Sequence, residues 1–142
     1  MALAPLAGSR WLGTAELWLD PLGNEAQTSP CTIELERDEV RYTWAYQGAP
    51  HRGTITLGGE GGTFVDSWHS PAPMPCRAAP SWAPVDLIGS YAAGDGPAWG
   101  WRLLLSLRPA SDGAPEALVL QMVNIAPWGE ETRAVRMIAT RA

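Results

Sequence analysis

The chain has 142 residues, a formal net charge of −5 and ten basic residues, all of which are arginine. This length is typical of one domain, so we expect a single domain over residues 1–142. Hydrophobic residues make up 46% and charged residues 18% of the chain, a composition that excludes a disordered protein. The acidic balance disfavours nucleic acid as a partner, and no apolar run approaches the roughly 20 residues of a membrane-spanning helix.

The N-terminal segment Met1–Gly8 has no basic residue, and Pro5 interrupts its short apolar stretch. This is not the pattern of a signal peptide, so we expect a cytoplasmic protein. Cys31 and Cys76 are the only cysteines, and in a cytoplasmic chain we expect both to be free thiols. The zinc-binding spacings CxxC and HExxH do not occur, so neither a metal nor a cofactor is expected.

Alternating apolar and polar residues, the pattern of half-buried strands, run through most of the chain. The predicted strands are, in chain order, residues 10–19, 31–36, 39–46, 51–57, 63–69, 86–91, 99–107, 117–125 and 132–141. The predicted turns, rich in glycine, proline and acidic residues, are residues 20–24, 37–38, 58–62, 94–97, 111–115 and 127–130. The segment 31–46 thus predicts a hairpin, with Tyr42 and Trp44 on one face of its second strand.

The segment 70–84 differs from the rest because it contains five prolines. Proline cannot donate a hydrogen bond to a neighbouring strand, so we expect a loop here. Loops of this length commonly serve as lids or binding loops, and this one directly follows Trp68 and His69.

Many short strands at regular spacing, without an amphipathic helix, predict an all-β fold. Successive short hairpins suit an antiparallel up-and-down β-barrel of about eight to ten strands, and closure removes exposed sheet edges. A barrel of about eight strands encloses room for one small ligand.

A few residues resemble the calycin group of small barrels, which includes the lipocalins and the fatty-acid-binding proteins. The segment Gly8-Ser9-Arg10-Trp11 is similar to the Gly-x-Trp motif near the lipocalin N-terminus, although its spacing is one residue longer. There the tryptophan plugs one end of the barrel beside an arginine of the last strand, a role that Arg141 or Arg136 would take here. The block 94–102 resembles a segment of bacterial calycin-like proteins of unknown function. The resemblance implies a ligand-binding barrel without specifying the ligand.

Some calycin-like barrels bind haem through a late histidine, but no histidine follows residue 69 here, so haem is not expected. Eight tryptophans outnumber three tyrosines and one phenylalanine. Such residues suit either a packed core or an aromatic wall for a planar or apolar ligand. The candidate ligand-binding residues are Tyr42, Trp44, Trp68, His69, Trp101, Arg102 and Asn124.

Several of these candidates have two interpretations. Trp101 and Arg102 point to opposite faces of a regular strand, so at most one of them lines the interior. An inward Arg102 would bind a carboxylate, whereas an inward Trp101 favours a neutral ligand. Asp66 and His69 would also face opposite sides, unless the strand ends or bulges between them. An inward Asn124 needs a polar partner or a ligand.

We therefore expect a cytoplasmic barrel that binds a small hydrophobic or aromatic ligand, without demonstrated catalysis. One alternative is a small barrel enzyme, an isomerase or hydrolase, with Asp66 and His69 at its site. The other is a structural module whose core is filled. GxSxG and Walker-type motifs are absent, which disfavours the common nucleophilic and nucleotide-binding sites. A homodimer is compatible with the sequence.

Overall fold

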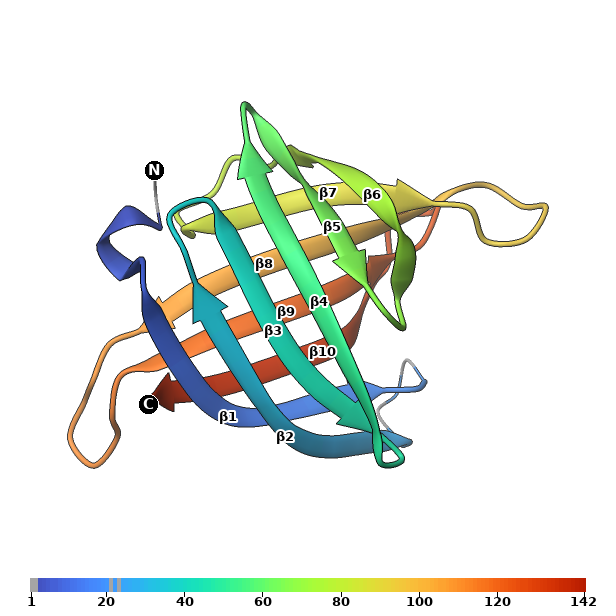
Figure 1. The fold of residues 1–142 in the computed structure, drawn as a ribbon. Helices are drawn as coiled ribbons and strands as arrows, with labels where there is room; N and C mark the ends of the chain where they lie inside the picture. The colour runs from blue at the N-terminus through green and yellow to red at the C-terminus, as the bar shows by residue number, and fades with distance from the viewer. Residues whose placement is uncertain (1–2, 21, 23) are drawn as a thin grey trace.

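The computed structural model describes residues 3–20, 22 and 24–142, and these form a closed antiparallel barrel of ten strands (Figure 1). Every strand pairs with its neighbours in sequence, and β1 pairs with β10 to close the barrel. The strands are β1 (Ser9–Trp18), β2 (Ala26–Leu35), β3 (Glu39–Tyr46), β4 (Ala49–Gly58), β5 (Gly61–Asp66), β6 (Ser70–Ala78), β7 (Val85–Tyr91), β8 (Trp99–Arg108), β9 (Ala117–Ile125) and β10 (Glu131–Arg141). The expected all-β, up-and-down architecture is confirmed.

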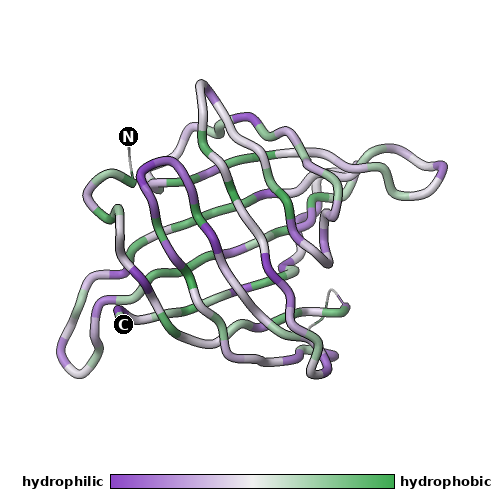
Figure 2. Tube along the Cα trace, in the orientation of Figure 1, coloured by the Kyte–Doolittle hydropathy of each residue, from purple (hydrophilic) through white to green (hydrophobic). Residues whose placement is uncertain are grey.

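The strands follow from their side-chain alternation, which puts every second residue inside the barrel. Figure 2 shows hydrophobic and hydrophilic residues alternating along the strands. On β8, for example, Trp101, Leu103 and Leu105 are buried, whereas the residues between them are partly exposed. Buried aliphatic side chains from β2, β4 and β9 meet them in one hydrophobic core. Much of the barrel interior is therefore filled by side chains.

One end of the barrel, here the capped end, carries the short 3-10 helix η1 (Ala4–Leu6) and the last residues of β10 (Figure 1). Leu3 and Trp11 are fully buried there. Arg141, the register partner of Trp11, lies over the indole ring at 4.7 Å. The plug that the lipocalin resemblance implies is thus present, with Arg141 rather than Arg136 as its cation. Within the described residues, no helix is long and apolar enough to cross a membrane.

The proline-rich segment 70–84 is a strand over most of its length, and the prediction of a long loop was wrong. Pro71, Pro73 and Pro75 occupy alternate positions of β6, and alternate residues direct their backbone nitrogens toward the same neighbouring strand. β6 pairs with β7 only through Cys76, Arg77 and Ala78, beyond the last of these prolines. The prolines therefore lack N–H groups only where β6 has no hydrogen bonds to make with β7, while pairing of β6 with β5 continues.

Three further boundaries differ from the sequence prediction. β2 begins at Ala26, five residues before the predicted start. β5 ends at Asp66, so residues 67–69 form a turn instead of continuing the strand. Gly61 and Gly62 belong to β5, which shortens the predicted glycine-rich turn. In the predicted turn 20–24, residues 21 and 23 lie outside the described residues, as do residues 1 and 2 of the N-terminal segment.

Candidate functional site

The end of the barrel opposite the capped end is rich in aromatic residues, and we name it the aromatic end. It is formed by the turns that follow β1, β3, β5, β7 and β9 (Figure 1). Six of the eight tryptophans lie at or near these turns: Trp18, Trp44, Trp68, Trp99, Trp101 and Trp128. Trp18 packs on the outer surface beneath Arg133 and Arg136, whereas Trp44 and Trp101 are buried.

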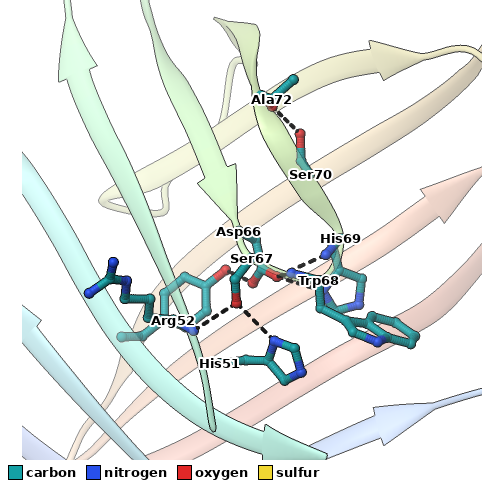
Figure 3. A network of polar contacts seen from close by, with 9 residues as sticks. His51, Arg52, Asp66, Ser67, Trp68, His69, Ser70 and Ala72 are labelled. Carbon is teal, nitrogen blue, oxygen red and sulfur yellow. Dashed lines mark hydrogen bonds and ion pairs between the residues drawn. The ribbon is translucent and has the colours of Figure 1, made fainter. Parts of the chain in front are cut away.

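Asp66 organises the turn between β5 and β6. Its carboxylate is fully buried, and Oδ1 accepts the backbone N–H groups of Trp68 at 2.8 Å and of His69 at 2.9 Å (Figure 3). The His69 imidazole also approaches this oxygen, with Nδ1 at 3.3 Å. Because β5 ends at Asp66, the chain reverses and brings Asp66 and His69 together. The sequence analysis left open that the two side chains meet if the strand ends between them, and this is what the structure shows.

Tyr42 completes a chain of polar contacts from inside the barrel. Its hydroxyl donates to Asp66 Oδ2. Burial, followed by the adjacent charge and hydrogen bond of Asp66, raises the pKa of Tyr42 well above its usual value, so the phenol remains a donor. Burial alone would raise the pKa of Asp66. The hydrogen bonds and charge of His69, together with the Tyr42 hydrogen bond, outweigh burial and lower it to about 2. Asp66 is therefore a carboxylate at neutral pH.

His69 lies among three tryptophans. Its ring centroid is 5.5 Å from Trp44 and 5.2 Å from Trp101, both tilted, and 4.7 Å from the perpendicular Trp68. The ionised carboxylate of Asp66 can only accept a hydrogen bond, so Nδ1 carries the proton in this contact. In this tautomer Nε2 is the ring nitrogen that can accept a hydrogen bond.

Two buried donors flank this imidazole. Trp44 and Trp101 are only 3% and 4% exposed, and the Nε1–H group of each has no hydrogen-bond partner among the described residues. A buried N–H group without a partner costs about 1–3 kcal/mol relative to a satisfied one. Two such groups lie close to one histidine, and a hydrogen-bond acceptor would satisfy either of them.

Asn124 and Tyr91 add a polar contact beside Trp101. Asn124 is the register partner of Trp101 on β9, and its Oδ1 accepts the Tyr91 hydroxyl. The Tyr91 ring also meets Trp101 edge to face at 6.3 Å. The predicted candidates Tyr42, Trp44, Trp68, His69, Trp101 and Asn124 thus all come to the aromatic end. The sequence interpretation missed Tyr91, although its parity on β7 matches that of buried residues.

Arg102 lies on the outer face of the sheet, so the alternative in which it points into the barrel and binds a carboxylate is wrong. It lies between inward Trp101 and Leu103, and it binds Asp86 on the outer surface through Nε at 2.9 Å and Nη2 at 2.7 Å. Asp86 is itself buried, so this bidentate pair compensates its charge. The guanidinium has a structural partner and does not reach the His69 cluster through the sheet.

An accessible groove lies apart from the His69 cluster. A groove of about 560 Å³ opens on the outside where β6 diverges from β7, and Cys76, Gly89 and Trp99 are among its lining residues. At the aromatic end, Trp68 is 42% exposed and contacts His69. Of the three indoles in contact with the His69 ring, Trp68 is thus the one that is exposed.

No known protein family and no curated protein matches this chain. The fold and the site define a small all-β barrel with a plugged end and an aromatic end that carries an Asp66–His69 pair.

Proposed function

We propose that the chain is a cytoplasmic, calycin-like barrel protein that binds a small, planar, mainly apolar ligand at its aromatic end. The observation that carries this proposal is that Trp44 and Trp101, whose rings both contact His69, have buried indole N–H groups without a partner among the described residues. A hydrogen-bond acceptor on the ligand would satisfy one or both donors.

The surroundings of the donors suit a flat ligand. Trp44, Trp68 and Trp101 offer aromatic surface around the imidazole, and stacked or edge-to-face aromatic contacts add about 0.5–1.5 kcal/mol to simple burial. The Arg102 guanidinium is engaged with Asp86 on the outer face. A neutral acceptor, such as a carbonyl or ether oxygen, therefore fits this site better than a carboxylate.

The ligand would reach the cluster beside Trp68. This indole belongs to the three-residue turn between β5 and β6, and it is the most exposed of the rings that contact His69. Its movement would uncover the imidazole without breaking any strand pairing. We propose that ligand binding displaces the Trp68 side chain and takes its place against His69.

The proposal is tested with a panel of planar ketones, phenols, aromatic acids and fatty acids. Binding is measured by quenching of tryptophan fluorescence and by the shift of the melting temperature. Trp101→Phe keeps an aromatic ring but removes the N–H donor, so it should weaken binding roughly three- to tenfold, the value of one ordinary hydrogen bond. Trp82→Phe is the matched control, because Trp82 is exposed in the loop at the capped end.

Neutral planar ligands should bind more tightly than carboxylates of the same size. If no compound of the panel changes fluorescence or melting temperature, the filled-core module is the better account of this barrel. Equal weakening by Trp101→Phe and Trp82→Phe would place the binding elsewhere.

A further inference from the structure

We infer that the aromatic end is a proton-transfer site, in which His69 Nε2 removes a proton from the carbon next to a ketone carbonyl. This inference rests on the proposed function and deepens it by naming the substrate class: a planar, enolisable ketone. The reaction is the shift of a proton between carbon atoms or between carbon and solvent.

The first support is the orientation of the imidazole. Nδ1 faces the Asp66 carboxylate at 3.3 Å, and the backbone N–H of His69 binds the same oxygen at 2.9 Å. Two contacts to one carboxylate fix both the position of residue 69 and the tautomer of its ring. A carboxylate that holds the Nδ1 proton and stabilises the imidazolium is the arrangement that activates histidine as a general base.

The second support is that Asp66 is itself held from the opposite side. The Tyr42 hydroxyl donates to Oδ2 while Oδ1 serves His69 and Trp68. Both carboxylate oxygens are thus occupied, and the group is fully buried. Tyr42 and Asp66 act here as positioning residues, because neither would touch the substrate.

The third support is the pair of indole donors. When a proton leaves the carbon next to a carbonyl, negative charge develops on the carbonyl oxygen. Preorganised N–H donors in a water-poor site stabilise such charge. Trp44 and Trp101 provide two buried N–H groups, both without a partner among the described residues, and both rings lie within 5.5 Å of the imidazole, centroid to centroid. A ketone engages the donors and the base together, whereas an alkane or a simple ether engages at most one kind of group.

The step balances without any further reactant. The C–H bond breaks, and its proton forms an N–H bond with His69 Nε2. The C–H electron pair becomes the C=C bond of the enolate, and the carbonyl π pair moves to oxygen, where the indole N–H groups bind it. The imidazolium then returns this proton, or one that it has exchanged with solvent, to the same carbon or to a conjugated one. Nothing is oxidised or reduced, and no group leaves.

The experiment uses the full chain with 2-tetralone, a flat bicyclic ketone with acidic C–H groups. Proton NMR in D₂O follows the loss of the C–H signals, while fluorescence quenching in the same samples measures binding. Positioned acid–base groups contribute roughly a hundredfold or more, so exchange should exceed that with an equal concentration of free imidazole by about this factor. His69→Gln should remove the acceleration.

His51→Gln is the matched control, since His51 is the other histidine and is bonded to Ser67 rather than Asp66; because its ring stacks on Trp44 at 4.8 Å, quenching by 2-tetralone is measured in this variant too. It should retain the acceleration. Asp66→Asn tests the positioning role, because an amide oxygen in the place of Oδ1 keeps the two backbone hydrogen bonds but removes the negative charge that stabilises the imidazolium. Exchange should then fall at least tenfold, and its dependence on pH should change. If Asp66→Asn does not fold, Tyr42→Phe supplies the same test of the pH profile.

The outcomes separate the two proposals. Quenching by 2-tetralone without accelerated exchange would overturn the proton-transfer inference and leave ligand binding intact. Acceleration that survives in His69→Gln would also overturn it. If 2-tetralone does not bind, the substrate class is wrong, and the wider ligand panel decides whether the binding function stands.

Discussion

Gly53 leaves the space that the Tyr42 phenol occupies, which makes Gly53→Ala a direct test of the polar chain behind His69. The two residues are register partners on β4 and β3. A Cβ atom at position 53 would lie 2.1 Å from the Tyr42 hydroxyl oxygen and 2.2 Å from Cζ. Two phenol atoms at such distances cannot be accommodated by a small rotation, so Tyr42 must move away from Asp66.

The cost can be worked out from these contacts. Overpacking a well-packed interior costs about 1–3 kcal/mol. Moving the phenol also removes a hydrogen bond to a charged group, worth about 1.5–3 kcal/mol. The two costs do not add in full, because moving the phenol relieves the clash at the same time as it breaks the hydrogen bond. We therefore expect Gly53→Ala to lower the free energy of unfolding by about 2–4 kcal/mol.

Urea unfolding followed by tryptophan fluorescence measures this loss, with Gly58→Ala as the control. Gly58 lies on the same strand, and a Cβ atom there meets no atom within 4 Å, so that variant should change stability by less than about 1 kcal/mol. A second readout is alkaline titration of tyrosine absorbance. A displaced Tyr42 should ionise at a lower pH than in the wild type, where burial and Asp66 raise its pKa. Unchanged stability and an unchanged titration in Gly53→Ala would refute the packing argument.

Four other predictions follow from single residues. Trp11→Ala should lower the free energy of unfolding by about 3–5 kcal/mol, as truncation of a buried aromatic does. A loss below about 1 kcal/mol in denaturant unfolding would refute the role of Trp11 as a plug. The pKa of Asp66 is lowered from 3.8 to about 2 in the folded state. The ionised carboxylate therefore contributes about 2 kcal/mol to the free energy of unfolding above pH 4, and this contribution is lost as the pH falls through about 2. The difference in stability between the wild type and Asp66→Asn should accordingly shrink as unfolding is measured at falling pH across this window. Arg102→Met should lower stability but leave ligand affinity unchanged, as calorimetry or fluorescence titration would show. Burial raises the pKa of the Cys31 thiol to about 11, so iodoacetamide should label the less buried Cys76 first, and mass spectrometry would detect the reverse order if the burial is wrong.

The strands were largely predictable because their signal is local. Alternation over β3 marks both the element and its buried face, the apolar runs of β8 and β9 mark the elements, and the observed bounds of all three differ little from the predicted ones. β6 was missed because proline prevents pairing on only one side of a strand. Whether that side faces a partner depends on the neighbouring strand, which sequence does not show. The same limit applied to Arg102, whose outward direction is fixed by the register of β7 and β8.

The candidate site was predictable in composition but not in arrangement. Tyr42 and Trp44 share a face by simple alternation, and their burial follows from it. The meeting of Asp66 and His69 depends on where β5 ends, and that end is stabilised by the buried carboxylate itself through two backbone N–H groups. A short polar side chain that caps a turn is visible in sequence only as one aspartate among several. Long-range closure then brings Trp101 to the same imidazole.

The tryptophans at the two ends of the barrel argue against a purely structural role for the aromatic end. At the capped end, the Trp11 Nε1–H donates to Ser9 Oγ at 2.9 Å, so a fully buried indole has its partner. At the aromatic end, Trp44 and Trp101 are nearly as buried, yet neither indole N–H has a partner among the described residues. Phenylalanine would fill most of the same space without the cost of about 1–3 kcal/mol for each unpaired donor. A barrel that needed only packing would gain by that exchange, so the two donors favour the proposed acceptor beside His69 over a filled core.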